Sequence, residues 1–301
     1  MTESAVSIRA VRKSYGAVEA LKGVDLEIRP GEVFSILGPN GAGKTTLVEI
    51  LEGYRSRSGG EATVLGTDPG HPTAAWRARI GVVLQSTAVF DELTVQEVIE
   101  EFSRFYPEPL EVGRVIGLVG LDEKRIARCG NLSGGQKRRV DLALGLIGNP
   151  ELIFLDEPTT GLDPQARHLI WERLKQLLSR GKTIVLTTHF MDEAERLCNR
   201  VMVIDHGATI AEDSPAGLIT REIEPNVVEV TGEGLAPWAE QARSARLAER
   251  IELVGETAFA YCREPAALVA SLQQLPGLRY LLRRANLEDV FLKVTGRDLR
   301  D

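Results

Sequence analysis

Residues 38–45 read Gly38-Pro39-Asn40-Gly41-Ala42-Gly43-Lys44-Thr45, which fills every position of the pattern GxxxxGK[ST]. An apolar segment of strand length precedes this stretch, and an apolar pattern with helical spacing follows it. Strand, glycine-rich loop and helix form the context in which the pattern marks a phosphate-binding loop. The alternative, a simple glycine turn before a helix, would explain the glycines but not the presence of a lysine at position 44.

The chemistry of this loop follows from its residue types. Glycines let backbone N–H groups turn toward phosphate oxygens, and the start of the following helix adds partial positive charge. Lys44 supplies a cation for the β and γ phosphates of a nucleoside triphosphate, and Thr45 offers a hydroxyl to Mg²⁺. The loop therefore predicts a nucleotide site.

A second motif lies at the end of a predicted strand. Residues 152–155 are apolar, and Asp156 and Glu157 follow them directly. An aspartate at a strand tip beside a phosphate loop can hold Mg²⁺, directly or through water. Glu157 is then the candidate general base for an attacking water. Strands that merely end in polar residues are common. The assignment of this motif as a metal and base site therefore depends on the complete phosphate loop earlier in the chain.

Between these two motifs lies Leu132-Ser133-Gly134-Gly135-Gln136, which ends 20 residues before Asp156. Ser133 can cap a helix, and the two glycines leave N–H groups exposed to an anion. This segment resembles the signature of ABC-family ATPases, and the resemblance covers about residues 5–220. It implies an α/β fold with a P-loop NTPase core: a mostly parallel sheet, an antiparallel N-terminal subdomain and a helical signature subdomain. It also implies ATP and Mg²⁺ as cofactors.

The same resemblance assigns roles to further positions. Tyr15 looks like the aromatic residue that stacks on adenine, and Gln85 like the glutamine that reaches Mg²⁺ and the attacking water. Asp163, in Gly161-Leu162-Asp163, resembles the D-loop aspartate, although it can equally be a helix N-cap. His189 resembles the switch histidine that contacts the γ-phosphate. The structural alternatives are an ordinary tyrosine at 15 and an ordinary histidine at 189.

Three sets of site residues follow from the motifs and the resemblance. The catalytic set is Lys44, Gln85, Glu157 and His189, and the metal set is Thr45, Gln85 and Asp156. In the family two ATPase domains pair head to tail, so the signature of one chain would serve the ATP of the other. The nucleotide set is Tyr15, Gly38, Pro39, Asn40, Gly41, Ala42, Gly43, Lys44, Thr45, Thr46, Asp163 and the signature residues Ser133, Gly134, Gly135 and Gln136.

Periodicity predicts two domains. Alternating strands and helices over 1–222 favour a mostly parallel sheet with covered faces. The resemblance implies that this region is the ATPase domain, with a helical subdomain at about 90–145 that docks a membrane partner. The apolar pattern lapses near Pro225, and 226–301 reads as a small α+β accessory domain. Its first six elements run strand, helix, strand, strand, helix, strand, the order of a split βαβ sandwich. We expect a regulatory or dimer-stabilising role, with Leu287, Val290, Phe291 and Val294 as the candidate contact surface.

Composition narrows the choice of partner. The 301 residues carry 36 basic and 43 acidic side chains, a net charge of −7, which disfavours nucleic acid as a partner. The three cysteines are far apart and odd in number, which is typical of reduced thiols in a cytosolic protein. No window approaches the roughly 20 apolar residues of a spanning helix. If the protein works at a membrane, another chain must do the spanning. The resemblance then implies a peripheral protein on the cytoplasmic side of the cell membrane, with a separately encoded permease and a second ATPase copy or homologue.

The branch of the family is indicated by two stretches. The run from Thr188 to Cys198 resembles ATPases that pair with type-2 permeases, and 286–292 with 295–297 resembles the ending of daunorubicin- and doxorubicin-resistance ATPases. The expected function is ATP hydrolysis that drives export of a drug, antibiotic or other hydrophobic compound. The alternative is a soluble, nucleotide-gated binding or protection module without transport. The compound, the direction of transport and the choice between homodimer and heterodimer stay open.

Overall fold

The computed structural model describes residues 4–84 and 91–296. These divide into two compact units, one up to Glu212 and one from Asp213 onward. The division comes about ten residues earlier than the lapse in periodicity suggested. Helix α8 (Pro215–Glu222), capped by Ser214, therefore belongs with the second unit and not with the first.

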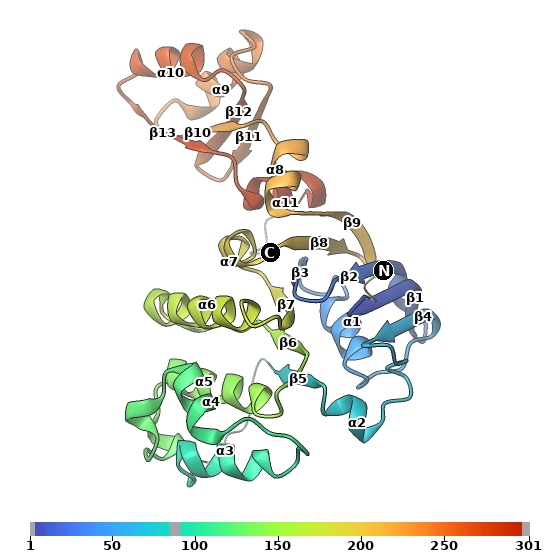
Figure 1. Ribbon diagram of the computed structural model, residues 1–301. Coiled ribbons are helices and arrows are strands. Elements are labelled where there is room, and N and C mark those ends of the chain that lie inside the picture. Colours follow the sequence, from blue (N-terminus) through green and yellow to red (C-terminus); the bar gives the residue numbers. More distant parts are fainter. Residues whose placement is uncertain (1–3, 85–90, 297–301) are drawn as a thin grey trace. The chain divides into compact units, whose positions relative to one another are not determined.

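A six-stranded sheet forms the centre of the first unit, in the order β5-β6-β7-β3-β8-β9 (Figure 1). The pairs from β5 to β8 are parallel, so their carboxyl ends meet at one edge. The inner strands are continuous apolar runs because helices cover them. The strands are β3 (Val33–Leu37), β5 (Ile80–Val83), β6 (Leu152–Asp156), β7 (Thr183–Thr188), β8 (Arg200–Asp205) and β9 (Ala208–Asp213).

An antiparallel sheet of β1 (Val6–Tyr15), β2 (Val18–Ile28) and β4 (Gly59–Val64) completes the core, in the order β2-β1-β4. Its buried residues join one apolar cluster with those of α1 (Lys44–Leu51) and the large sheet. The expected antiparallel N-terminal subdomain is thus present. The short helix α2 (Ala74–Arg77) leads into β5.

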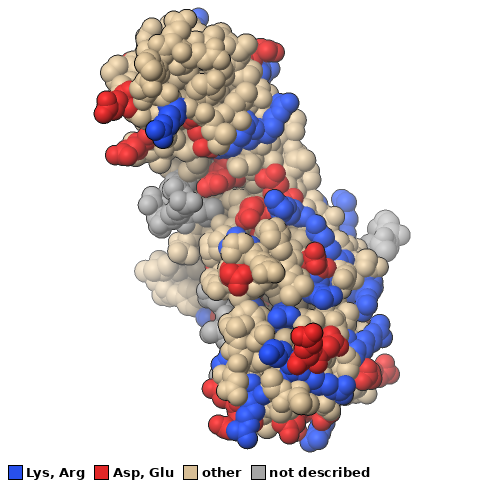
Figure 2. All heavy atoms as spheres, turned by 90° about the vertical axis from the view of Figure 1, so that its left-hand side faces the viewer, with Lys and Arg blue, Asp and Glu red and all other residues tan. Residues whose placement is uncertain are grey.

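The helical subdomain of the first unit is built from capped helices. Thr94 and Glu97 form a capping box at the start of α3 (Val95–Ser103). Ser133 and Gln136 form another at the start of α5 (Gly134–Leu146). On the face shown in Figure 2, basic and acidic side chains are interspersed over the first unit. The helical subdomain also contains α4 (Val112–Val119), η1 (Asp122–Lys124) and η2 (Cys129–Asn131). Two further helices of the first unit, α6 (Pro164–Leu178) and α7 (Met191–Leu197), come later in the chain.

The second unit has the predicted split βαβ topology. Its four strands are all paired antiparallel in the order β11-β12-β10-β13, and residues of two helices share a core with them. The elements that follow α8 are β10 (Asn226–Gly232), α9 (Leu235–Ser244), β11 (Arg250–Val254), β12 (Thr257–Cys262), α10 (Ala266–Gln273), β13 (Leu278–Arg284) and α11 (Leu287–Thr295).

Helix α11 is fixed at its start by one buried carboxylate. Asp289 accepts hydrogen bonds from the backbone N–H of Asn286 at 2.8 Å and from the Tyr261 hydroxyl at 3.2 Å. The guanidinium of Arg283 adds two more, at 2.6 and 2.9 Å. The carboxylate is thus both part of a capping box and the partner of a charged side chain, which satisfies a group that would be costly to bury alone.

The apolar face of α11 was expected to dock onto the ATPase core or onto the tail of a second copy, and its burial within the chain contradicts a free surface for a second copy. Leu287 and Val290 are buried, and Phe291 is only 1% exposed. The amphipathic pattern correctly marked an apolar face, but this face already packs within the folded chain, with α8 among its neighbours. Phe291 is therefore a buried residue of the folded chain.

All three cysteines are buried thiols. Cys129, Cys198 and Cys262 form no disulfide. Burial is the main cause that raises the pKa of each thiol, most strongly for Cys198.

Candidate active site

The loop between β3 and α1 has two positions that only glycine fits. A Cβ on Gly38 would lie 2.3 Å from the carbonyl oxygen of Ile204 in β8. Gly43 has φ of +107°, and a Cβ there would lie 2.7 Å from the carbonyl oxygen of Ala20. Close approach of neighbouring backbone therefore holds the loop in shape, and α1 begins with no side chain capping its first N–H groups.

Lys44 is folded back onto its own loop. Its Nζ donates to the carbonyl oxygens of Gly38 at 2.8 Å and Pro39 at 3.0 Å, and the residue is 8% exposed. Burial lowers the pKa of this ammonium, while the carboxylates of Glu157 and Asp156 act in the opposite direction. Lys44 therefore lies in the electrostatic range of both acidic residues predicted from the second motif.

Asp156 and Glu157 stand at the carboxyl end of β6, where neighbouring β7 adds a threonine. Thr187 is the register partner of Asp156, and its hydroxyl donates to Asp156 Oδ1 at 2.5 Å. The backbone N–H of Glu157 is directed to the same residue, 3.1 Å from the Thr187 carbonyl oxygen. Thr187 of the adjacent strand thus holds the carboxylate of Asp156 and the backbone of Glu157.

The Glu157 side chain meets His189 at this edge. His189 Nδ1 lies 3.3 Å from Glu157 Oε1, and the Thr160 hydroxyl donates to Glu157 Oε2 at 3.0 Å. Glu157 has φ of +44°, a left-handed conformation that is strained for a residue with a side chain. The structure therefore brings together Lys44, Asp156, Glu157 and His189, which the sequence had distributed over 146 positions.

Two other predicted site residues are exposed. Thr45 lies in the first turn of α1 and exposes its side chain. Tyr15, at the end of β1, is 41% exposed, with Lys13 Nζ 5.2 Å and the Arg55 guanidinium 5.3 Å from its ring centre. An exposed aromatic ring beside cations suits a base that carries phosphates. Gln85 lies outside the described residues.

The signature lines a different cavity from the phosphate loop. Ser133, Gly135 and Gln136, together with Asp163, line a hollow of about 470 Å³ between the first turns of α5 and α6. Asp163 is the predicted N-cap and accepts from the backbone N–H of Ala166 at 2.9 Å. No residue of 38–46 lines this hollow. Within one chain, then, the two predicted halves of the nucleotide site occupy separate surfaces.

Comparisons with known proteins agree with these motifs. Residues 21–160 match the ABC transporter family. Nod factor export ATP-binding protein I of Ralstonia nicotianae is 48% identical, over 98% of this chain and 95% of that protein. This chain belongs to the ABC transporter ATP-binding subunits. The subunit is accordingly an ATP hydrolase, and the expected fold class is confirmed.

Further relatives of this ABC subunit carry the same description. The Nod factor export ATP-binding protein I of Cupriavidus metallidurans is 48% identical, over 98% of this chain and 99% of that one. Residues 236–296 match the C-terminal domain of the nodulation factor export protein NodI. The chain's tail suggested the daunorubicin-resistance type, but these relatives are named as Nod factor export proteins instead.

Solved ABC structures share the fold of the subunit. An ATP-binding cassette in its ADP conformation matches with a TM-score of 0.63 at 27% identity, over 70% of this chain and 91% of that one. A dimeric, post-hydrolysis cassette bound to ADP and Pi matches with a TM-score of 0.63 at 28% identity, over 69% and 98%.

One residue of the subunit's site was missed by the sequence reasoning. Arg138 of α5 is buried, and its guanidinium donates to the carbonyl oxygens of Asp156 at 2.7 Å and Pro158 at 3.0 Å. It also donates to the carbonyl oxygen of Leu84, directly before Gln85. Burial lowers the pKa of this guanidinium. Arg138 thus connects the signature helix α5 to the carboxyl ends of β5 and β6. In the sequence, the only feature that could have indicated this residue is an arginine five positions after Ser133.

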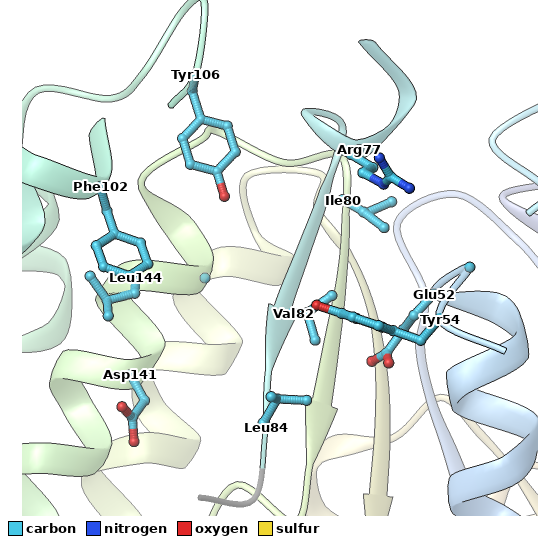
Figure 3. Close-up of a pocket in the computed structure, with 12 residues that line it drawn as sticks. Glu52, Tyr54, Arg77, Ile80, Val82, Leu84, Phe102, Tyr106, Asp141 and Leu144 are labelled. Carbon is cyan, nitrogen blue, oxygen red and sulfur yellow. The ribbon is translucent and has the colours of Figure 1, made fainter. Parts of the chain in front are cut away.

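A groove of the subunit runs between the end of β5 and the helical subdomain (Figure 3). It has a volume of about 420 Å³. Phe102, Tyr106 and Leu144 face it from the helical side, and Ile80, Val82 and Leu84 from the strand. Glu52, at the end of α1, is a buried acid in its wall, and burial, with the charges of Asp156 and Glu49, raises the pKa of this carboxyl to about 8.

Proposed function

We propose that this subunit hydrolyses ATP in order to drive export through a separate membrane permease. Each ATP is held between the phosphate loop of one chain and the signature of a second chain. The observation that carries the proposal is the separation of the two motifs. The phosphate loop follows the carboxyl end of β3, whereas Ser133, Gly135 and Gln136 line a hollow to which no residue of the loop contributes. A second copy or a homologous ATPase, paired head to tail, completes the site. The solved cassettes described as dimeric support this assembly.

The residues at the sheet edge take distinct roles in hydrolysis. Lys44 exchanges its two loop carbonyls for phosphate oxygens, which offer it charged acceptors. Glu157 accepts the proton of the attacking water, and His189, 3.3 Å away, contacts the γ-phosphate. Tyr15 stacks on adenine.

Mg²⁺ fits the donors present at this edge. Asp156 and Thr45 offer a carboxylate and a hydroxyl, oxygen ligands of the kind that Mg²⁺ takes. Among residues 4–84 and 91–296 there is no group of three or more acidic, histidine or cysteine side chains that could hold a metal. Mg²⁺ bound to nucleotide needs only one or two protein ligands besides phosphates, so such a sparse set is suitable. When bound, the ion would neutralise phosphate charge.

The apolar groove beside the helical subdomain is the proposed docking site of the permease. In the described part of the chain, no helix has the length and apolar character needed to cross a bilayer. A permease segment that buries apolar side chains against Phe102, Leu144 and Leu84 would place the subunit at the cytoplasmic side of the membrane. Cycles of ATP-driven pairing would then move the permease.

The cargo belongs to the same proposal. The chain's tail favours a drug, antibiotic or other hydrophobic compound, whereas the names of the relatives favour Nod factor. We propose export of a compound from one of these two classes, with the second favoured by similarity over nearly the full chain.

Co-purification and a transport assay test the proposal. The tagged subunit is pulled down from detergent-solubilised membranes, and the permease that comes with it is reconstituted in vesicles together with the subunit. We expect ATP-dependent cargo movement that is lost when Glu157 is replaced by glutamine. Capture of a soluble target with no permease would instead support a nucleotide-gated protection module.

A further inference from the structure

The second unit has an open cavity of about 970 Å³ at one end of its sheet. It lies where the turn after α9 enters β11 and where β12 leads into α10. Four arginines line it, against two glutamates. Residues 213–301 carry 11 basic and 14 acidic side chains, so this local excess of positive charge is a property of the cavity and not of the whole unit. The lining residues are Arg243, Arg246, Leu247, Ala248, Glu249, Arg250, Ile251, Arg263, Glu264 and Ala267.

Arg250 shows that the guanidinium groups are only partly satisfied. Its charge is paired with Glu252, and its guanidinium lies 3.9 Å from the centre of the Tyr261 ring. Two of its nitrogens, Nε and Nη2, are buried and have no hydrogen-bond partner in the described chain. Buried donors of this kind are rare, because leaving one unpaired costs about 1–3 kcal/mol. The ion pair and the ring contact therefore fix the Arg250 guanidinium beside the cavity, where it contributes positive charge.

The other arginines keep donors available at the cavity rim. Arg263 is exposed, and its Nε lies 4.0 Å from Glu249 Oε1, beyond hydrogen-bond reach. Arg246 is exposed and, among the described residues, has no ion-pair partner. Arg243 is more occupied, since it pairs with Glu240 and donates to the carbonyl oxygen of Ile251 at 2.8 Å.

The start of α10 adds to the positive potential. Ala267, in its first turn, lines the cavity, and no side chain caps this helix. Its first N–H groups therefore lack a side-chain acceptor, and the helix end carries partial positive charge. The uncapped start of α10 and the four arginines thus border the same cavity.

We propose that this cavity binds a phosphate-bearing anion, either a small soluble molecule or a lipid headgroup, as a regulatory ligand of the subunit. Arginine forks match phosphate oxygens in pairs, which distinguishes them from lysine as phosphate ligands. The volume exceeds that of one phosphate, so the cavity can take a larger phosphorylated group. Glu249 and Glu264 at the rim disfavour a polyanion that would cover the whole surface.

The test uses the full chain and a matched pair of variants. The site variant is Arg246→Asn with Arg263→Gln; asparagine suits position 246, whose φ is +54°. Both side chains are exposed, so the fold should persist. The control is Arg279→Gln, which removes an exposed arginine of the same unit that does not line the cavity. Should the double variant fail to fold, the single variant Arg263→Gln replaces it.

Binding is measured with inorganic pyrophosphate by titration calorimetry, with the chain saturated by Mg-ADP so that the phosphate loop is occupied. A parallel flotation assay uses phosphatidylglycerol vesicles against phosphatidylcholine vesicles. We expect saturable binding to one of the two anionic probes, weakened about tenfold or more in the site variant and unchanged in Arg279→Gln. Pyrophosphate binding identifies a soluble ligand, and binding only to anionic vesicles identifies a headgroup. Absence of binding to both probes, or equal binding by the site variant, overturns the proposal.

Discussion

His189 Nδ1 lies 3.3 Å from Glu157 Oε1, although the two residues come from different strand ends. The contact exists because β6 and β7 are parallel neighbours whose carboxyl ends open at one edge of the sheet. The histidine and the glutamate for which we propose roles in hydrolysis therefore lie side by side at this edge.

Replacing Glu157 by glutamine should leave ATP binding intact and nearly abolish turnover. The amide keeps the shape but cannot accept the proton of water, and general-base help is typically worth a factor of roughly 10²–10⁴. Steady-state phosphate release measures the loss, and titration with a fluorescent ATP analogue controls for binding. Release above about a tenth of the wild-type rate would remove Glu157 from this role.

Lys44→Ala should weaken nucleotide binding, hydrolysis or both. The ammonium is the only side-chain cation within 38–45, where it would face several phosphate charges. ADP-dependent stabilisation against heat reports on binding, and a turnover assay reports on chemistry. The matched control is Lys175→Ala, an exposed lysine of α6. If both quantities match the wild type, the loop is not the ATP site.

Tyr15 should act through its ring and not through its hydroxyl. We expect Tyr15→Phe to bind ATP as the wild type does, and Tyr15→Ala to bind it more weakly by about 1–3 kcal/mol, the usual value of stacking between a base and an aromatic side chain. Equilibrium titration of the two variants separates the alternatives. Equal affinities of the phenylalanine and alanine variants would show that adenine lies elsewhere.

The first unit should bind nucleotide by itself. A fragment of residues 1–213 keeps β9 whole and omits α8, which belongs to the second unit. We expect it to bind ATP with an affinity close to that of the full chain, measured by the same titration. A well-folded fragment that binds no ATP would mean that the second unit contributes to the nucleotide site.

Glu52 should make the stability of the subunit fall as pH rises. Its carboxyl has a pKa of about 8 in the folded protein against 4.5 in the reference state, because burial disfavours the charged form. The folded state therefore holds the proton more tightly than the unfolded chain, and stability is lost between about pH 4.5 and 8. Glu52→Gln should abolish this component, with a gain on the order of 1–3 kcal/mol at pH 8 and little change at pH 5. Urea unfolding at the two pH values measures the difference, and a slope equal to that of the wild type would contradict it.

Much of the site was accessible from sequence because its signals are local. The phosphate loop can be recognised from residues 38–45 and the flanking apolar pattern alone. Ser133 and Gln136, within four residues, mark the start of helix α5. The elements of the second unit from β10 onward were likewise visible in the apolar and polar pattern, whereas α8 was not predicted. Their order suggested the split βαβ topology that the structure has.

What the sequence did not show depends on partners distant in the chain. Arg138 looks like any helical arginine until folding brings the carbonyl oxygens of Leu84 and Asp156 to it. The edge strand β9 lacks an apolar run, because its side chains are largely exposed or half-buried. For α11, the pattern marked an apolar face but could not say that the same chain covers it.

The burial of Cys129, Cys198 and Cys262 has a practical consequence for spectroscopy. Thiol reagents attack the thiolate, and these three side chains are both shielded and held in the protonated form. A cysteine introduced at an exposed position, such as Lys175, should therefore take up a maleimide dye selectively in the native protein. Distance changes between labelled copies during ATP turnover can then be followed without first replacing the native cysteines.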